Sequence, residues 1–566
     1  MAAFGVVDTL SAAEPVKDPV REQQQLAVEL QSAPWGFWGP DPSKYSSWVS
    51  HSNRLIPIYT FGIGLDDFTG KNSAYRSEDK LKEIYGRLPT DTLNPHAQYM
   101  DQTDVYRLQR KAVDEGKKRV ILMIFDGNDW WSTWAAANYK NGQVGYREGR
   151  GTGLNFQDYR GVKTDYGYHV TAPHSINETV DVNAKKVKRN NKEVYGGFAW
   201  ETAGETPWAV ATDPNYYIGK GKIKHPYTDS SASATSMTAG IKTYNEAINV
   251  GVDGKPVDTI AHYVQKKGWP VGVVTSVPIP HATPGCAYAH NVDRGDYQDI
   301  SRDLLGLPSI YHPKEPLPGV DVLIGAGHGV ILGKDGEQGK NFIPGNQYLA
   351  NSDKAKIDVK NGGKYTIAER TAGKKGPDLL KAAAQDAIKH KTRLLGFFGT
   401  KYGHLPFRTA DGRYDPTVSI KRISTKPDYQ GKAEVYTPAD IDENPILADI
   451  AVAALDVLAS KGDKFWLMVE AGDVDWGNHA NNIDNSIGAT ISGDMAFTAI
   501  VEWIEKHGGW DDTALILTAD HGHYLTITRP DLLLPPATAN HAPPAKADAP
   551  KAAATPTTPA APATKR

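Results

Sequence analysis

Residues 119–126 read RVILMIFD, a run of mostly apolar side chains that ends in an aspartate. A short apolar run closed by a charged residue is typical of a β-strand that is buried on both faces. Similar runs recur along the chain at 270–277, 321–326, 393–399, 465–470 and 513–520. Helical patterns lie between them at 233–248, 377–390, 444–460 and 483–507. This alternation predicts an α/β fold, a three-layer α/β/α sandwich around a mostly parallel central sheet.

The composition is typical of a globular protein, with 40% hydrophobic and 23% charged residues among 566. A net charge of −3 gives no indication of nucleic-acid binding. No apolar run approaches the roughly 18–20 residues of a membrane span, so we expect no membrane-spanning helix. Cys286 is the single cysteine, which excludes an internal disulfide. The first residues lack the basic and apolar segments of a secretion signal, so no signal peptide is evident in this chain.

The chain is predicted to have three regions. We expect a loop-rich N-terminal extension at 1–95, the α/β domain at 96–533 and a tail at 534–566. Segments near 140–222 and 327–390 are predicted to be loops or a subdomain inserted in the α/β domain. The tail is rich in Pro and Ala and cannot bury a core, so it is predicted to be disordered.

Acidic and imidazole side chains follow three of the predicted strands. They are Asp126 after the first run, Glu470, Asp475 and His479 at and after the fifth, and Asp520 and His521 after the sixth. Ligands of parallel sheets bind at the carboxyl ends of the strands. One acidic residue there is usually a turn or cap residue, but three clusters of metal-ligand types together indicate a metal centre.

The types of these residues indicate which ions they suit. Asp475 and His479 are four residues apart, so they share one face of a helical turn. A carboxylate with an imidazole suits Zn²⁺, whereas carboxylates alone, Asp126 and Glu470, suit a harder ion such as Mg²⁺. Two zinc ions about 4 Å apart would clamp the attacking and leaving oxygens of an in-line displacement.

Residues 227–239 read YTDSSASATSMTA and lead into GIKTYNEAINV, which has the pattern of a helix. Ser230 falls at the start of this predicted helix, where backbone N–H groups favour phosphate. A cation at its oxygen would make this weak nucleophile an alkoxide, and its small neighbours leave room for a phosphoryl group. Alternatively, Asp229 or Ser230 is only a helix N-cap, a role that is compatible with catalysis.

The segment 277–294 reads VPIPHATPGCAYAHNVDR and follows another predicted strand. Thr283 offers a hydroxyl to a hard cation, and Arg294 offers a planar fork to two phosphate oxygens. Taken alone, such residues are more often a turn residue and a surface charge.

Five segments together resemble the alkaline phosphatase family. In chain order they read MIFDGNDW, TDSSASATSMTAGIKTYNEAI, HATPGCAYAHNVDR, VEAGDVDWGNHANN and LTADHGH. They occur in the family's order over about 400 residues, which makes the joint match far more specific than any one motif. The resemblance implies a metal-dependent phosphomonoesterase that hydrolyses small-molecule phosphate monoesters through a phosphoserine intermediate, with an alkaline optimum.

The resemblance also implies roles for individual residues. Ser230 would be the nucleophile, and Asp229 would orient Arg294, which grips phosphate. One zinc, bound also to the Ser230 oxygen, would be held by Asp126, Asp520 and His521; a second zinc by Asp475 and His479; and one magnesium by Asp126, Thr283 and Glu470. Two further histidines would support these ligands, His281 beside the magnesium and His523 through a hydrogen bond to Asp475.

The family's third protein ligand to the second zinc is not evident in this chain. In the family it is a histidine well downstream of the DHxH segment, but only His541, in the low-complexity tail, follows His523 here. His328 or His404 are the other candidates, brought into place by folding.

Two alternatives to a phosphomonoesterase stay open. One is a phosphodiesterase or sulfatase of the same superfamily, although a CxPxR-type sulfatase segment is absent and Arg294 favours a monoester dianion. The other is a phosphate- or metal-binding protein with little turnover, because the second zinc site is incomplete. The resemblance further implies a homodimer and a periplasmic or secreted location, neither of which a residue pattern indicates directly.

Overall fold

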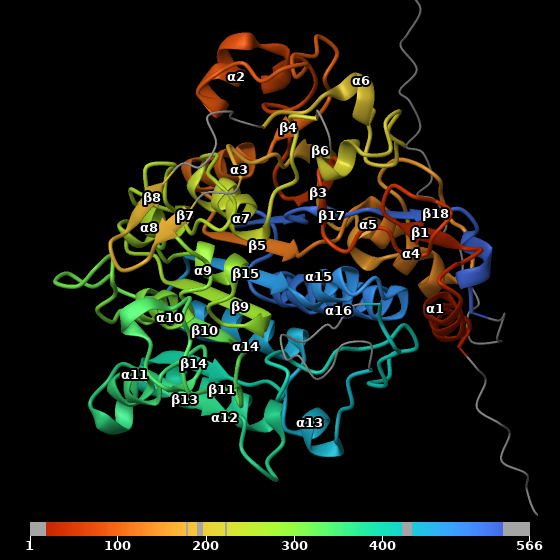
Figure 1. The fold of residues 1–566 in the computed structure, drawn as a ribbon. Helices are drawn as coiled ribbons and strands as arrows, with labels where there is room; N and C mark the ends of the chain where they lie inside the picture. Colours follow the sequence, from red (N-terminus) through yellow and green to blue (C-terminus); the bar gives the residue numbers. More distant parts are fainter. Residues whose placement is uncertain (1–17, 177–178, 189–195, 221–222, 421–432, 536–566) are drawn as a thin grey trace, which may run out of the picture.

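The computed structural model describes residues 18–176, 179–188, 196–220, 223–420 and 433–535. Its centre is a ten-stranded sheet in the order β13-β14-β10-β9-β15-β5-β16-β3-β6-β4 (Figure 1). The strands are β3 (Ile56–Phe61), β4 (Met100–Asp101), β5 (Arg119–Phe125), β6 (Thr164–Val170), β9 (Val271–Pro278), β10 (Val322–Ala326), β13 (Tyr365–Glu369), β14 (Arg393–Phe397), β15 (Phe465–Ala471) and β16 (Thr513–Thr518). Neighbouring strands are parallel except where β3 pairs with β16 and β6, so the sheet is mostly parallel.

Helices cover both faces of the sheet. Successive side chains of a strand point to opposite faces, so each strand contributes apolar side chains to a buried cluster on either side. In β5, one buried cluster takes Ile121, Met123 and Phe125, and a second takes Val120, Leu122 and Ile124. The first cluster includes α4 (Trp130–Asn141), α12 (Gly376–His390), α14 (Leu447–Ser460) and α16 (Ile483–Lys506). The second includes α3 (Thr103–Asp114), α7 (Ser230–Ala239), α8 (Ile260–Gln265) and α10 (Tyr297–Leu305). The predicted three-layer α/β/α sandwich is confirmed.

Each of the six apolar runs forms a strand of the central sheet, namely β5, β9, β10, β14, β15 and β16. Such runs identify strands here because helices bury both faces of the sheet. The sheet also takes β3 from the segment 1–95, β6 from 140–222 and β13 from 327–390. The boundaries of the three predicted regions stay predictions, and the tail from residue 536 lies outside the described residues.

Three of the predicted helices are confirmed as α12, α14 and α16. The prediction for 233–248 is wrong in its second half, because α7 ends at Ala239 and Gly240 adopts the left-handed conformation with φ 72°. The chain then turns back as an irregular segment, in which the backbone N–H of Glu246 donates to Oδ2 of Asp229 at 3.0 Å. The glycine thus returns the chain to the start of its own helix.

The N-terminal part of the chain packs on the segment that follows β16. After α1 (Pro19–Leu30) come two short strands, β1 (Gly36–Trp38) and β2 (His51–Ser52). β1 pairs antiparallel with β18 (Leu525–Ile527), and β2 pairs antiparallel with β17 (Gly522–His523). Figure 1 shows the red β1 beside the blue β18, so the two ends of the described chain meet.

The remaining elements are short. They are α2 (Glu78–Tyr85), α5 (Asn155–Asp158), α6 (Trp200–Ala203), α9 (Ala282–Cys286), α11 (Asn351–Ile357), α13 (Pro438–Asp442), α15 (Asp473–His479), β7 (Thr179–Asp181), β8 (Lys186–Lys188), β11 (Ile331–Leu332) and β12 (Gly345–Asn346). Within the described ranges, no helix combines the length and the apolar character that crossing a membrane requires.

We predict that Gly493→Ala destabilises the fold at the strand that leads to Asp126. Gly493 lies in α16, and a Cβ on it would lie 2.2 Å from Cε1 of Phe125. Alanine favours a helix over glycine by about 1 kcal/mol, yet this overlap should lower the free energy of unfolding by about 1–3 kcal/mol in urea denaturation. The neighbouring Ser492→Ala should change it by less than about 0.5 kcal/mol. Equal or greater stability of Gly493→Ala would show that the contact with Phe125 is not tight.

Candidate active site

Acidic residues at the carboxyl ends of three central strands lie close together. Asp126 follows β5, Glu470 lies near the end of β15, and Asp520 follows β16. All three side chains are fully buried. Gly127 permits this approach, because its φ is 69° and a Cβ on it would lie only 2.9 Å from Cα of Asp475. The turn after β5 therefore requires glycine.

Ser230 is the first residue of α7 and faces this group of carboxylates. Its Oγ lies 3.1 Å from Nε2 of His521 and 3.4 Å from Oδ1 of Asp126. Asp229 caps the helix, because its Oδ1 accepts the backbone N–H of Ala232 at 2.9 Å. The hydroxyl-rich stretch thus contains both features considered from its sequence, a helix cap at Asp229 and a serine among ligand-type residues.

A first group of ligand-type side chains surrounds Ser230. Asp126, Asp520 and His521 each offer one ligand atom, and these atoms lie within 4.8 Å of one another. Nε2 of His521 is 3.2 Å from Oδ1 of Asp126 and 3.5 Å from Oδ2 of Asp520. Two ligands of one tetrahedral zinc, each about 2.0–2.1 Å from the ion, lie about 3.3 Å apart. These separations therefore suit a shared ion.

Asp475 and His479 form a second group on α15. Nε2 of His479 lies 3.4 Å from Oδ1 of Asp475, again the separation expected of two ligands of one ion. Nδ1 of His479 donates to the carbonyl oxygen of Val49 at 2.8 Å, which directs Nε2 toward Asp475. Nε2 of His523 lies 2.8 Å from the same Asp475 oxygen, a hydrogen-bond distance.

A third group of oxygen atoms lies at the other carboxylate oxygen of Asp126. Oγ1 of Thr283, in α9, is 3.5 Å from Oδ2 of Asp126, and His281 is the N-cap residue of the same helix. Oε2 of Glu470 accepts the hydroxyl of Thr275, whereas its Oε1 is buried and has no hydrogen-bond partner among the described residues. An unpartnered buried carboxylate oxygen is an acceptor that a hard cation satisfies.

Arg294 is held beside Ser230 by Asp229. Its Nη1 donates to Oδ2 of Asp229 at 3.0 Å, and its backbone N–H donates to the carbonyl of Glu246 at 2.8 Å. Burial opposes its charge, but the carboxylates of Asp229 and Glu246 raise the pKa of Arg294 above its usual value. With 16% of its side chain exposed, the charged guanidinium can still reach a ligand.

The carboxylates of the site repel one another. Burial, and then repulsion from Asp475 and Glu470, raises the pKa of Asp126 well above its usual value. Burial and repulsion from Asp126 act in the same way on the pKa of Asp520, and burial raises the pKa of Glu470 to about 8. At Asp475 burial also acts upward, but the imidazole of His479 and its neighbours lower the pKa well below its usual value. A bound cation would relieve this repulsion.

The histidines expected to complete the second group lie elsewhere. Nε2 of His404 pairs with Glu434 at 3.0 Å and the ring of His328 packs against Phe397. Neither shares a group of ligand atoms with Asp475 or His479 among the described residues, so these two predictions are wrong. His541 lies outside the described residues.

His51 lies between the first and second groups, beside both Asp475 and His521, although no pattern in the sequence marks it. Its ring centroid lies 4.1 Å from that of His521 and 4.7 Å from that of His479. One ligand atom each from His51, Asp475 and His521 lies within 4.8 Å of the others. His51 precedes Asp475 by roughly 400 positions, and the pairing of β2 with β17 is the feature that brings it here.

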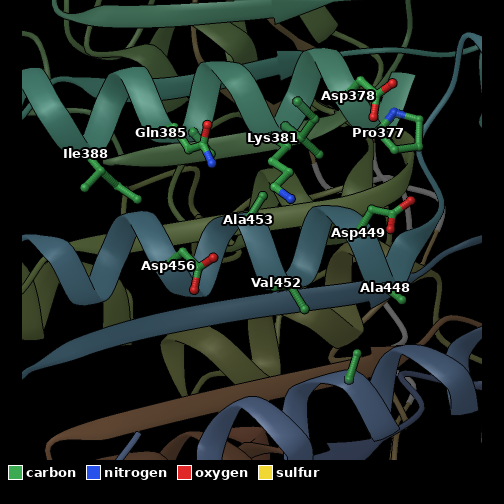
Figure 2. A pocket seen from close by; sticks show the side chains of 13 residues that line it. Pro377, Asp378, Lys381, Gln385, Ile388, Ala448, Asp449, Val452, Ala453 and Asp456 are labelled. Atoms are coloured by element: carbon green, nitrogen blue, oxygen red, sulfur yellow. The ribbon is translucent and has the colours of Figure 1, made fainter. Parts of the chain in front are cut away.

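A hollow of about 510 Å³ lies away from these groups, between α12 and α14 (Figure 2). Aliphatic side chains such as Val452 line it together with the polar ends of Lys381, Asp449 and Asp456. None of the ligand-type residues described above lines this hollow, so it is separate from the candidate site.

We predict that ionisation of Glu470 destabilises the metal-free protein as the pH rises. A carboxyl group whose pKa is raised by folding contributes full stability below its unfolded pKa, and this contribution is lost as the pH rises through the folded pKa. For Glu470 this range runs from the ordinary value of 4.5 to about 8. In EDTA, the free energy of unfolding of the wild type, measured in urea, should fall over this range relative to that of Glu470→Gln, and Zn²⁺ with Mg²⁺ should reverse this fall.

Glu470→Gln is the matched control, because it removes the ionisation with little change in size. In EDTA it should show a shallower decline with pH than the wild type. A difference between the two proteins that stays constant over this pH range would contradict the raised pKa of Glu470.

The chain is similar to known proteins of one family. A sequence model described as alkaline phosphatase matches residues 206–555, more than half of the chain. The alkaline phosphatase of Escherichia coli K12 is 30% identical over 369 residues, which cover 61% of this chain and 69% of that protein. Alkaline phosphatase 4 of Bacillus subtilis is 27% identical over 312 residues, which cover 55% of this chain and 50% of that protein. The crystal structure of the cold-active alkaline phosphatase of Shewanella sp. aligns with a TM-score of 0.41 and 19% identity, over 71% of this chain and 68% of that one. The chain belongs to the alkaline phosphatase family of enzymes.

Proposed function

We propose that this protein hydrolyses small-molecule phosphate monoesters through a phosphoserine at Ser230, with two zinc-type ions and one magnesium-type ion. The observation that carries the proposal is the position of the Ser230 hydroxyl, 3.1 Å from His521 and 3.4 Å from Asp126. A hydroxyl among cation ligands is a nucleophile that bound cations activate. Membership of the alkaline phosphatase family supports the same chemistry.

The residues of the site fit cations of both kinds. Carboxylate and imidazole atoms 3.2 to 3.5 Å apart suit zinc, and the third group, made of oxygen atoms with the unpartnered Oε1 of Glu470, suits magnesium. When bound, such ions lower the pKa of a nearby hydroxyl and offset the charge of a phosphoryl group. We assign Asp126, Asp520 and His521 to one zinc-type ion, Asp475 and His479 to the other, and Asp126, Thr283 and Glu470 to the magnesium-type ion.

Arg294 and Asp229 position the phosphate in this proposal. Asp229 engages one edge of the guanidinium through Nη1, which leaves further N–H groups to bind two phosphate oxygens. The same carboxylate caps α7, so the fork and the helix start are fixed relative to one another. The N-terminus of α7 adds a favourable dipole for an anion.

Ser230 carries the covalent step. Its oxygen attacks phosphorus in line as the bond to the leaving alkoxide breaks, and the alkoxide takes up, through solvent, the proton that the Ser230 hydroxyl gives up, so that the alcohol departs. Water then cleaves the phosphoserine and releases inorganic phosphate, which regenerates Ser230. The adjacent Ser231, Ala232 and Ser233 are small enough for a phosphoryl group to approach.

We predict that Ser230→Ala abolishes phosphate release from p-nitrophenyl phosphate, lowering kcat by more than about 10³-fold, because the attacking oxygen is gone. Ser236→Ala is the matched control on the same helix, where the hydroxyl donates to the carbonyl of Ala232 at 3.0 Å. It should keep kcat within about threefold of the wild type, because its effect is local. Retained turnover in Ser230→Ala would exclude this serine as the nucleophile.

We predict faster hydrolysis of p-nitrophenyl phosphate than of bis-p-nitrophenyl phosphate. The Arg294 fork pairs with two non-bridging oxygens of a monoester dianion, and a diester carries less charge to meet it. The comparison of kcat/KM for the two esters should favour the monoester by at least about tenfold, or 1.4 kcal/mol in transition-state stabilisation. A diester preference would instead identify a phosphodiesterase.

We further propose, from family membership alone, that the enzyme is a homodimer that works in the periplasm or outside the cell.

A further inference from the structure

Residues 46–54, here called the N-terminal strap, run past the end of α15. Within the strap, β2 pairs with β17 so that His51 stands opposite His523. Asn481, two residues after α15, donates from Nδ2 to the carbonyl of Trp48 at 2.8 Å. The strap is therefore bound on one side next to α15, which carries Asp475. On the other side it is bound to β17, which directly follows Asp520 and His521.

Arg54 fixes the other end of the strap. Its side chain is 1% exposed, donates from Nη2 to Oγ1 of Thr526 at 3.0 Å and lies 3.6 Å from Asp129. Its guanidinium also lies 4.8 Å from the ring centroids of Tyr217 and Tyr524. Separating a buried charge from such partners is costly, so the strap has one defined path past the site.

This path brings His51 beside Asp475 and His479 of the second group and beside His521 of the first. Its ring centroid is 4.7 Å from that of His479 and 4.1 Å from that of His521. One ligand atom each from His51, Asp475 and His521 lies within 4.8 Å of the others. Oγ of Ser50 is 3.2 Å from Nδ1 of His51, and in the tautomer in which Nδ1–H donates to it, Nε2 is unprotonated and can bind a cation.

The strap also orients the other imidazole of this group. The carbonyl of Val49 accepts Nδ1–H of His479 at 2.8 Å, and Nε2 of His479 then faces Asp475 at 3.4 Å. A carbonyl partner on the far ring nitrogen is the usual support of a metal-binding imidazole. Val49 and His51 are two residues apart, so one extended segment both orients a ligand and presents another.

His523 is less suited than His51 to complete the group. Its 2.8 Å separation from the Asp475 oxygen is that of a hydrogen bond, shorter than the roughly 3.3 Å between two ligands of one zinc. His523 therefore supports the carboxylate, and Asp475 with His479 supplies only two ligands. Catalytic zinc sites use three protein ligands and keep one position open.

We propose that His51 is the third protein ligand of the cation held by Asp475 and His479. The proposal rests on the proposed function for the presence of that cation. His51 precedes residue 206, where the match to the family model begins, so the ligand comes from the N-terminal side of the chain. Cation binding then fastens the strap to the site, and loss of the cation releases one of its attachments.

His51→Ala tests the proposal through zinc binding. Affinity is measured by competition with a chromophoric chelator, and the number of bound ions by elemental analysis. We expect one zinc to bind at least about 10²-fold more weakly, with the other ions unchanged. His51→Asp restores a ligand oxygen and should recover part of the lost affinity. His96→Ala, which removes an exposed histidine, should bind zinc like the wild type.

Co²⁺ in place of zinc gives a second readout, because its visible absorption reflects the ligands around it. His51→Ala should change this spectrum, whereas His96→Ala should not. Wild-type zinc affinity together with a wild-type Co²⁺ spectrum in His51→Ala would overturn the proposal. If His51→Ala does not fold, a crystal structure of the zinc-loaded wild type decides. Nε2 of His51 at about 2.0–2.1 Å from the ion supports the proposal, and a separation above about 3 Å overturns it.

These measurements separate the proposal from the proposed function, because neither depends on turnover. Zinc binding that depends on His51 without hydrolysis of phosphate monoesters would leave the ligand assignment standing and reject the activity. If the protein hydrolyses phosphate monoesters and His51→Ala binds zinc as tightly as the wild type, only the ligand assignment is rejected.

Discussion

The close approach of four buried carboxylates is the constraint on which this site depends. Asp126, Glu470, Asp475 and Asp520 are each 4% exposed or less. Their repulsion is tolerated because parallel pairing of β15, β5 and β16 fixes the strand ends side by side. The backbone N–H of Gly127 and the ring of His523 satisfy oxygens of Asp520 and Asp475 by hydrogen bonds, and bound cations are the natural complement for the negative charge. The glycine at 127 belongs to the same arrangement, since a side chain there would collide with Asp475.

The direction of the sheet explains why distant segments supply one site. Parallel strands have their carboxyl ends on the same side of the sheet, so the residues that follow each strand become neighbours there. α7 then brings a hydroxyl to that side at its first residue, and Asp229 ties the helix start to Arg294. The proposed nucleophile and the phosphate-binding fork are thus positioned by one carboxylate. The residues that directly follow Ser230 in α7 are small, so they place no bulky side chain next to it.

The N-terminal segment adds a second layer of support to this arrangement. It contributes β3 to the central sheet and pairs β1 and β2 with the strands after β16. Its contacts reach the site itself, because Val49 bonds to His479 and His51 lies beside His521. In the proposed assignment, stability of the fold is linked to occupancy of the metal centre, as expected where ligands from separate parts of a chain share an ion.

The six buried strands could be predicted from the sequence. Strands that helices cover on both faces are apolar throughout, so they appear in the sequence as continuous apolar runs. The sequence also identified the residues at their carboxyl ends, since carboxylates and imidazoles rarely follow three strands by chance. Tertiary structure alone decided the rest. β3 carries Pro57, which argues locally against a central strand, and Gly240 ends α7 within a pattern that reads as helix. The place of His51 follows from the two-residue pairing of β2 with β17, which leaves no local pattern. Local patterns record burial and backbone preference, whereas contacts between distant segments depend on how the whole chain packs.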